Sequence, residues 1–240
     1  MCVRIYLIEK DELEKTFNIN KLDDLVKFRL DNIAKVGNNL SPENSQLIIY
    51  QDLDNHNYKM EIAKWGLVPS FSKTIETQYN MVNTRIESIL EKPFFKRLSH
   101  HHRCIIPVSG YYEWSGEKGS KQPHAIYSKK NKYLYLAGLW DLWTSANGDE
   151  VLSFSIITKP ADNELESIHH RMPLIFNEKQ AKFWISNATD KQEIDQFITS
   201  ASLTKDFASK QQKIKLSIVD VDKSVNNPGN VEFNVHSYLD

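Results

Sequence analysis

The chain has 240 residues with 40% hydrophobic and 25% charged side chains, which suits one large domain or two small ones with a substantial core. Its 30 basic and 31 acidic side chains exclude nucleic-acid binding through a global positive field, so such binding would need a local basic patch. There is no apolar run long enough to cross a bilayer, and the N-terminus MCVRIYLIEKDELEK turns acidic too early for a secretory signal. Two isolated cysteines, Cys2 and Cys104, form no disulfide framework, which favours a cytoplasmic protein without a membrane partner.

The first third of the chain predicts one helix, a strand pair and a second, shorter helix. Residues 20–36 place apolar side chains near helical spacing, which predicts an amphipathic helix. The segments QLIIYQD and YKMEIAKW are typical of two strands joined by the turn-prone LDNHN. A loop, WGLVPSFSK, follows, and PFFKRLSH predicts a short helix with Pro93 in its first turn.

The middle of the chain is rich in strands, and the last third alternates helices with one late strand. Strands are indicated by RCIIPVSGYYEW, HAIYSKK, KYLYLAGLWDLW, VLSFSIITK and KLSIVDVD, and helices by ADNELES, NEKQAKFWIS and DKQEIDQFITSAS. Neither a repeat nor a low-complexity linker interrupts them. We therefore predict one α+β domain over residues 1–240, with an antiparallel, barrel-like β core flanked by helices.

Cys2 would become the N-terminus if Met1 were removed, and it would then carry a free α-amine and a thiol on adjacent carbons. An aldehyde can form an imine with such an amine, and the thiol can close onto the same carbon to give a five-membered thiazolidine. The alternative is that Cys2 is a small buried hydrophobe at the start of a strand. Arg4, on the same face of an extended strand, would lower the pKa of the thiol and could bind a phosphate.

Two further segments place polar side chains in apolar surroundings. In the first, NTRIE, an extended chain would point Asn83 and Arg85 the same way, which suits a sugar hydroxyl and a phosphate. The alternative is that Asn83 or Thr84 caps a helix that begins at Arg85. In the second, GYYEW, desolvation would raise the pKa of Glu113 towards the range of a general acid or base. Its alternative is a carboxylate facing water from an edge strand, together with Tyr111 and Ser115.

The segment IHHRMP offers a histidine for proton transfer near neutral pH, His169, beside the phosphate-sized donor Arg171. A zinc site that also uses His100–His102 is the competing interpretation. Adjacent strand residues point apart and the chain has no HExxH or CxxC, so we expect no metal. The run from His100 to Arg103 is instead expected to be a solvated basic patch.

The order of these motifs carries more information than any one of them. MCxR, WGLVPSF, NTRIES, RCIIPVSGYYEW, AGLWD, IHHRMPLIF and VNNP follow one another along the chain. In this order they resemble the SRAP family, the SOS-response-associated peptidase-like proteins that protect abasic sites in single-stranded DNA. The resemblance covers about residues 2–228, and we assign no function to the short C-terminal extension. It implies the SRAP fold and no cofactor.

The resemblance implies that Met1 is cleaved and that Cys2 forms a thiazolidine with the ring-opened aldehyde of an abasic deoxyribose. It implies that Asn83 orients the substrate and that Glu113 accepts and donates protons. His169 is expected to protonate the sugar oxygen and promote ring opening. The resemblance also implies several DNA contacts. Arg4, Arg85 and Arg171 match positions that hold phosphates, and Asn39 and Pro42 match a loop that lies against the strand. Phe71 matches an aromatic residue that stacks on a base, and Thr158 matches a residue near the abasic sugar.

Two departures from the family pattern stand out, because Val3 replaces a usual glycine and Thr84 replaces an alanine.

The leading hypothesis is that the protein cross-links to abasic sites and has an associated lyase activity. We expect it to act as a monomer on single-stranded DNA or at strand junctions, and to be associated with the nucleoid when it is bound. A cysteine peptidase that processes its own N-terminus is one alternative. The other is a non-covalent reader of single strands or junctions.

Overall fold

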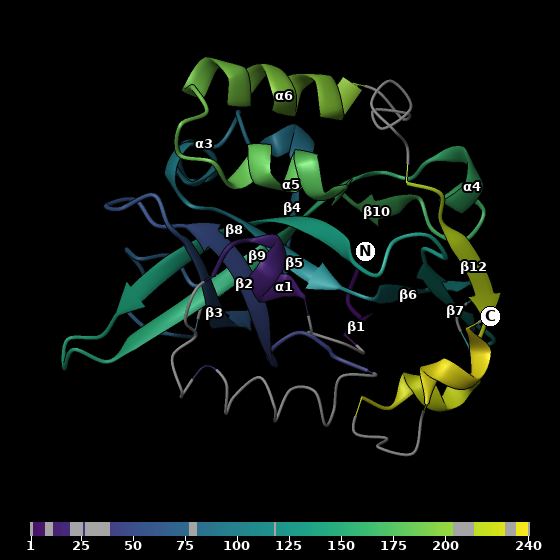
Figure 1. Ribbon diagram of the computed structural model, residues 1–240. Coiled ribbons are helices and arrows are strands. Elements are labelled where there is room, and N and C mark those ends of the chain that lie inside the picture. The colour runs from purple at the N-terminus through teal and green to yellow at the C-terminus, as the bar shows by residue number, and fades with distance from the viewer. Residues whose placement is uncertain are drawn as a thin grey trace.

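Five strands close into a barrel at the centre of the molecule (Figure 1). The computed structural model describes residues 2–7, 12–19, 26, 39–76, 81–117, 119–203, 214–228 and 234–239. Neighbouring strands pair in the order β9, β3, β2, β5, β8, and β8 pairs again with β9 to complete the ring. The barrel strands are β2 (Ser45–Gln51), β3 (Tyr58–Trp65), β5 (Arg103–Val108), β8 (Leu134–Thr144) and β9 (Glu150–Pro160).

The barrel is antiparallel except where β3 meets β9, and these two strands run parallel. A ring with an odd number of strands cannot reverse direction at every step, so at least one pair must be parallel. The predicted antiparallel, barrel-like core is therefore confirmed, except that β3 and β9 are parallel. Short strands extend the barrel: β4 (Asn83–Arg85), which is also parallel to β9, β10 (Arg171–Pro173) and β11 (Ile175–Phe176).

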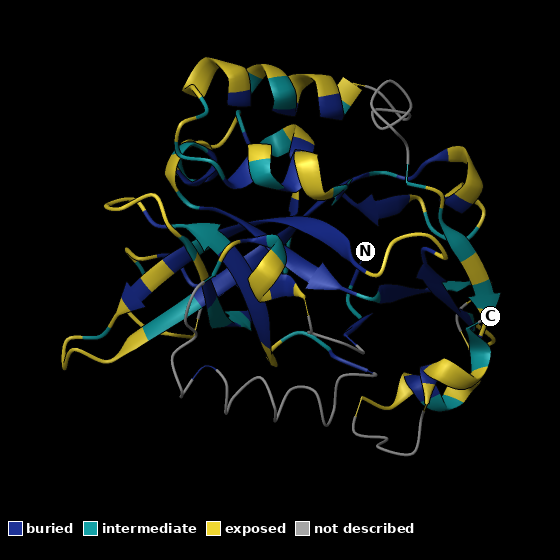
Figure 2. Ribbon diagram, in the orientation of Figure 1, coloured by how far each residue is buried: buried dark blue, intermediate teal, exposed yellow. Residues whose placement is uncertain are grey.

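Helices cover one side of the barrel, above it in the view of Figure 1. They are α3 (Pro93–His101), α5 (Glu178–Ile185) and α6 (Lys191–Leu203). Their apolar side chains, including Trp184 and Ile198, share one core cluster with barrel residues such as Ile105. Every residue of β5 is consequently buried, because one face fills the barrel and the other lies under the helices (Figure 2).

A second sheet of four strands packs beside the barrel in the order β1, β6, β7, β12. Its strands are β1 (Ile5–Tyr6), β6 (Gly110–Ser115), β7 (Gln122–Tyr127) and β12 (Ser217–Asp220). Gly110 is required where β6 pairs with β1, because an added Cβ would lie 2.2 Å from the Tyr6 hydroxyl and 2.5 Å from the Ile126 carbonyl. This close approach brings the start of the chain against β6, which carries Glu113.

The remaining elements are short: α1 (Leu13–Thr16), η1 (Ile86–Ser88), α4 (Asn163–Glu166), η3 (Lys223–Asn226) and η4 (Val235–Tyr238). The other predicted strands and the helices after residue 90 are confirmed, with ends shifted by a few residues, but RCIIPVSGYYEW forms two strands, β5 and β6, which belong to different sheets. The helix predicted over residues 20–36 lies outside the described residues except for Val26. Within the described ranges, no helix is long and apolar enough to cross a membrane.

Candidate active site

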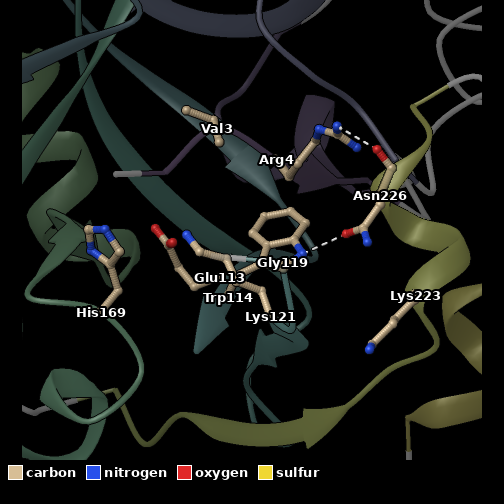
Figure 3. Close-up of a pocket in the computed structure, with 9 residues that line it drawn as sticks. All are labelled: Val3, Arg4, Glu113, Trp114, Gly119, Lys121, His169, Lys223 and Asn226. Carbon is tan, nitrogen blue, oxygen red and sulfur yellow. Dashed lines mark hydrogen bonds between the residues drawn. The ribbon is translucent and has the colours of Figure 1, made fainter. Parts of the chain in front are cut away.

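One cavity of about 640 Å³ lies beside the four-stranded sheet (Figure 3). Its walls come from the start of the chain, from β6 and the turn that follows it, from the segment before β10, and from η3. The lining residues are Val3, Arg4, Glu113, Trp114, Gly119, Lys121, His169, Lys223 and Asn226. Glu113 and His169, two residues predicted to transfer protons, therefore open onto the same space although they are far apart in the sequence.

Cys2 is completely buried, directly before the cavity-lining Val3. It packs in the core cluster that contains Ile5 and Tyr111, as expected for a small buried residue. Burial raises the pKa of the Cys2 thiol well above its ordinary value, and the charge of Glu113 raises that pKa further. The predicted lowering of this pKa by the Arg4 guanidinium is wrong, since that group contacts other parts of the molecule. The thiol is therefore neutral until a base takes its proton.

Asn83 holds the backbone of Cys2 in place. It lies on β4, opposite Ile156 of β9, and its Nδ2 donates a hydrogen bond to the Cys2 carbonyl at 2.8 Å. The amide oxygen Oδ1 is buried and receives no hydrogen bond from any residue in the described ranges. The helix-capping alternative is wrong, because η1 begins after Arg85 without a side-chain cap. Asn83 thus keeps a buried, unsatisfied acceptor on the residue that holds the Cys2 backbone.

Glu113 is only 4% exposed. The interpretation as an outward-facing residue of an edge strand is wrong, because β6 lies between β1 and β7 and Tyr111 on the same face is also buried. Burial raises the pKa of Glu113 from 4.5 to about 7, although the positive α-amine of the chain and the charge of Lys121 act in the opposite direction. Near neutral pH this carboxyl group can therefore both accept and release a proton.

His169 lies between α4 and β10, with its ring half-buried at the cavity. The ring is anchored because Nδ1 accepts a hydrogen bond from the backbone N–H of Arg171 at 3.0 Å. It stacks on His170 with ring centroids 4.4 Å apart. Burial lowers the pKa of His169, and the positive α-amine lowers it further. The neutral imidazole therefore predominates at pH 7, and Figure 3 shows the ring beside the Glu113 side chain.

The Arg4 guanidinium is held by protein acceptors. Nη1 donates to Asn39 Oδ1 at 2.8 Å and to the Val225 carbonyl at 2.9 Å, and Nη2 donates to the Asn226 carbonyl at 3.2 Å. The guanidinium also lies 5.9 Å from the centre of the Trp114 ring. Asn39, predicted to contact DNA, is only 4% exposed, and its Nδ2 donates to the Val225 carbonyl at 2.9 Å. These two residues therefore tie η3 to the start of the chain.

Arg171 is bound in a similar way. Its guanidinium forms a two-pronged ion pair with Glu87, at 2.6 Å and 3.0 Å. It also donates to the Thr158 carbonyl at 2.6 Å. Thr158, predicted to lie near the abasic sugar, is fully buried. Burial alone would raise the pKa of Glu87, but hydrogen bonding to Arg171 and the charges of Arg171 and Arg85 hold it below its ordinary value. The pair joins η1 to β10.

Because Arg171 is buried, loss of its charged partner should lower stability. Glu87→Gln is expected to reduce the free energy of unfolding by about 1.5 to 3 kcal/mol, the range for hydrogen bonds to charged groups. Denaturant unfolding measures this change. Glu178→Gln is the matched control, because Glu178 pairs with Lys182 on the exposed face of α5 and such pairs contribute about 0.3 to 0.5 kcal/mol. Equal small losses in both variants would show that Arg171 is not held by Glu87.

The other predicted DNA contacts lie at the surface. Arg85 is exposed at the end of β4, and Pro42 is half-exposed before β2. Phe71 is 72% exposed and meets Phe94 edge to face, with ring centroids 5.2 Å apart. Since an exposed aromatic ring backed by a second ring is a suitable stacking surface, Phe71 keeps its predicted role as a candidate contact for a base.

Asp141, which the sequence analysis did not single out, fixes the loop that carries Phe71. Its buried carboxylate accepts the Ser70 backbone N–H at 2.8 Å and Arg97 Nη2 at 3.2 Å. Burial alone would raise the pKa of Asp141, but hydrogen bonds from His102 and Ser70 and the charge of Arg97 hold it below its ordinary value. The signal available in the sequence was an acidic residue inside the apolar strand AGLWDLW.

The run from His100 to Arg103 is not a solvated basic patch. Arg103 is 4% exposed and donates to four backbone carbonyls, among them Ser99 at 2.7 Å and Ser186 at 2.7 Å. His100 Nε2 lies 2.8 Å from Asp195 Oδ1 on α6. This run therefore joins helices to the barrel, an outcome that charge composition alone does not indicate. Among the residues that the structure describes, no group of three or more metal-ligating side chains comes together.

Three cavity residues were missed by the sequence analysis: Lys121, Lys223 and Asn226. The first two are exposed, and Asn226 Oδ1 accepts a hydrogen bond from Trp114 Nε1 at 2.7 Å. No local pattern marks the two lysines, which the fold brings together from the chain before β7 and from η3, and Asn226 belongs to the VNNP motif, in which no residue was given a role. Val3 lines the same cavity and does not have the positive φ that favours glycine. The replacement of glycine by Val3 therefore adds bulk at the cavity without backbone strain.

Solved structures share this fold along almost the whole chain. A protein from Bacteroides thetaiotaomicron superposes with a TM-score of 0.76 at 25% sequence identity, covering 96% of this chain and 99% of that chain. A phage-related protein from Bordetella bronchiseptica gives a TM-score of 0.65 at 23% identity, with 92% and 95% coverage.

Sequence comparison finds curated relatives as well. The chain is 31% identical to "Abasic site processing protein YoqW" of Bacillus subtilis, covering 78% of this chain and 80% of the relative. It is 33% identical to "Abasic site processing protein HMCES" of Gallus gallus, but this match covers only 55% of the chain and 46% of that longer protein. The family model of the SOS response associated peptidases matches residues 1–228, and the chain therefore belongs to the SRAP family.

Proposed function

We propose that this protein processes abasic sites in single-stranded DNA by trapping the sugar aldehyde on Cys2 as a thiazolidine. The observation that carries the proposal is the arrangement around Cys2: Asn83 fixes its backbone, the charge of Glu113 reaches its thiol, and His169 shares a cavity with Glu113. The names of the curated relatives support the same class of substrate. The trap requires removal of Met1, which frees the α-amine of Cys2.

The chemistry needs two bonds to one carbon. The α-amine of Cys2 adds to the aldehyde, water leaves, and an imine forms. The sulfur then bonds to the imine carbon, while the thiol proton is transferred to the nitrogen. The product differs from the reactants by the loss of one water, and no oxidant or reductant is consumed. An internal cysteine cannot form this ring, because its nitrogen is part of a peptide bond.

Glu113 is proposed to move the protons in both steps. Its pKa of about 7 lets the acid protonate the departing hydroxyl, and the resulting carboxylate can then take the proton of the buried, neutral Cys2 thiol. Loss of the hydroxyl as water leaves the nitrogen with the hydrogen that it keeps in the ring, and the thiol proton replaces the one that Glu113 gave up, so Glu113 ends each cycle protonated, as it began. The same group can run the steps backwards and reverse the cross-link.

His169 and Asn83 are proposed to prepare the sugar. An abasic deoxyribose is mostly a closed ring, and the aldehyde appears only when the ring oxygen receives a proton. His169 lies at the cavity with Nδ1 also 3.1 Å from the Arg171 carbonyl. The minor protonated form of the ring can therefore donate from Nδ1 to that carbonyl and transfer its other ring proton to the sugar oxygen. The unsatisfied Oδ1 of Asn83 can accept a hydrogen bond from a sugar hydroxyl and so orient the sugar beside Cys2.

The proposal is tested with two DNA strands that differ only in the aldehyde. Protein with a free N-terminal Cys2 should form a denaturant-resistant adduct with a strand that contains an abasic site. The same strand should give no adduct after borohydride has reduced its aldehyde to an alcohol. Equal yields from both strands would contradict capture of the aldehyde, and adducts on neither strand would reject the proposal.

Two finer activities follow from the same groups. The imine favours β-elimination, so slow strand cleavage beside the abasic site is the proposed lyase activity. Self-processing is the second candidate, because Glu113 lines the same cavity as Val3 and Arg4 at the start of the chain. Mass spectrometry of Glu113→Ala separates the possibilities: retained Met1 supports self-processing, whereas normal removal indicates a host aminopeptidase.

Phe71 is proposed to stack on a base of the bound strand. Phe71→Ala should weaken non-covalent binding of single-stranded DNA by about 1 to 3 kcal/mol, the usual contribution of one stacked base. Fluorescence anisotropy measures the loss. Leu203→Ala is the matched control, since Leu203 is 78% exposed at the end of α6. Equal effects of the two substitutions would remove Phe71 from the DNA-binding surface.

A further inference from the structure

The loop that carries Phe71 is tied to the barrel at every second residue. The ties are three hydrogen bonds of 2.8 Å between the loop backbone and side chains of β8 and β9: Val68 N–H to Ser153 Oγ, Ser70 N–H to Asp141 Oδ2, and Trp143 Nε1 to the Ser72 carbonyl. Phe71 lies between the last two ties, yet its side chain is 72% exposed. The barrel therefore fixes the backbone on both sides of a ring that faces solvent.

Asp141 supports the same ring by a second route. Its Oδ2 also accepts a hydrogen bond from Arg97 Nη2 at 3.2 Å, and the Arg97 guanidinium lies 5.7 Å from the centre of the Phe94 ring. Phe94 in turn meets Phe71 edge to face. One carboxylate therefore holds both the backbone beside Phe71 and the side chains against which Phe71 packs.

Asp141 is itself too deeply buried to contact a DNA strand, with 1% of its surface exposed. A carboxylate in such a place costs more desolvation free energy than an apolar side chain of similar size. What it supplies is orientation, through directed hydrogen bonds that an apolar side chain cannot accept. Orientation matters for binding, because each side chain that must be ordered on association lowers the affinity by roughly 2-fold to 10-fold.

We propose that Asp141 and Trp143 position Phe71 for stacking on a base, so that the loop is ordered before DNA binds. This inference rests on the proposed function, because it takes a single DNA strand as the ligand and Phe71 as its contact. It deepens that function by identifying β8 of the barrel as the element that presents the stacking ring. Both positioning residues act through Phe71.

Charge and positioning predict opposite effects for Asp141→Ala. The substitution removes a negative charge, and by charge alone it would strengthen binding to a polyanion. Loss of a positioning residue should instead weaken binding by roughly 2-fold to 10-fold, because the loop must then be ordered at the moment of binding. Trp143→Phe removes only the Nε1 donor to Ser72 and should weaken binding for the same reason.

The test is a double-mutant cycle on the non-covalent affinity for an intact single strand, measured by fluorescence anisotropy. Asp141→Ala and Trp143→Phe are each made in the wild-type protein and in Phe71→Ala. Each should weaken binding in the wild-type background and have no effect in the Phe71→Ala background, because no ring is left to position. A role in folding alone does not depend on Phe71 and would give equal factors in both backgrounds.

Two variants control for the charge and for the loss of a loop contact. Asp52→Ala is the matched control, because Asp52 is also buried and accepts two backbone N–H groups of the turn between β2 and β3, at 2.8 Å and 3.2 Å. It removes the same charge from a turn that lacks Phe71, so it should lower stability without weakening DNA binding. Asp141→Asn loses the charge but keeps an oxygen that can accept the Ser70 N–H, so it should retain the wild-type affinity.

Equal factors in both backgrounds would overturn the inference, as would wild-type affinity in Phe71→Ala or in both positioning variants. If Asp141→Ala does not fold, the Trp143→Phe cycle decides the question. These outcomes are independent of the aldehyde trap, since an intact strand has no aldehyde. Coupling to Phe71 in a protein that forms no adduct with abasic DNA would support the positioning and reject the trap, whereas equal factors in a protein that does cross-link would reject the positioning alone.

Discussion

Replacing Cys2 with serine should abolish the denaturant-resistant adduct while leaving the first chemical step intact. Serine keeps the α-amine, so the imine with the abasic aldehyde still forms, but the hydroxyl oxygen is a far weaker nucleophile than sulfur and does not close a stable ring. Borohydride, which reduces an imine to an amine, should therefore trap Cys2→Ser on the DNA. The measurement is the yield of cross-linked protein on a denaturing gel, with and without borohydride.

Cys104→Ser is the matched control for this experiment. Cys104 is the second cysteine of the chain and is also fully buried, but it lies in β5 of the barrel and lacks the cavity groups that surround Cys2. Its replacement should leave the adduct yield unchanged. A stable adduct of Cys2→Ser without borohydride, or loss of the adduct in Cys104→Ser alone, would assign the capture to another group.

Glu113→Gln should slow cross-linking by roughly 100-fold to 10,000-fold, the usual contribution of a positioned general acid–base group. Glutamine preserves the shape of the side chain and its capacity for hydrogen bonds, but it cannot take the thiol proton. Single-turnover kinetics at saturating DNA isolate this step from binding. A rate equal to that of the wild-type protein would remove Glu113 from the mechanism.

The same substitution should change two pH profiles. The cross-linking rate of the wild-type protein should have an inflection near pH 7, where Glu113 titrates, and the variant should lack it. Stability should respond too, because the pKa of Glu113 is higher in the folded chain than in the unfolded chain. As pH rises from 4.5 to about 7, the unfolded chain loses its proton first, so wild-type stability falls by roughly 3 kcal/mol. Denaturant unfolding of Glu113→Gln should show no such decline.

Much of the fold could be predicted from local patterns. The strand pair at residues 45–65 and the helices at residues 178–203 follow from alternation, turn residues and helical spacing. The parallel pairing of β3 with β9 could not, because it arises from closing an odd ring, and no window of sequence encodes the number of strands. The burial of Arg103 was missed for a similar reason, since its carbonyl partners come from α3 and from the chain after α5.

The part of the candidate site that the sequence could predict consists of residues whose type and position are unusual. A cysteine at position 2 and a carboxylate between aromatic residues are unusual in themselves, and the structure places Glu113 close enough to Cys2 to influence its thiol. The sequence could not show that the Arg4 and Arg171 guanidinium groups are bound internally. That depends on η3, β9 and η1 arriving from distant parts of the chain. Lys121 and Lys223 were missed because single surface lysines carry no distinctive pattern.

The burial of Cys2 also has a consequence for how the trap works. A thiol with a strongly raised pKa does not react with passing electrophiles, because the thiolate is the nucleophilic form. Under the proposed mechanism, capture depends on an aldehyde that reaches the cavity and on the carboxylate of Glu113 as the local base. Selectivity for an abasic sugar over other cellular aldehydes would follow from this coupling. Contacts along a DNA strand supply the binding energy that positions its aldehyde, whereas a small free aldehyde has little surface with which to bind the protein.

The most direct test of the central proposal is mass spectrometry of the peptide released from the DNA adduct. The proposal predicts a peptide that begins at Cys2 without Met1, linked to the sugar with the loss of one water and unchanged in mass by borohydride. A thiazolidine contains no C=N bond, so borohydride has nothing to reduce. An adduct at Lys121 or at any internal residue, or one that gains hydrogen on borohydride treatment, would contradict the trap.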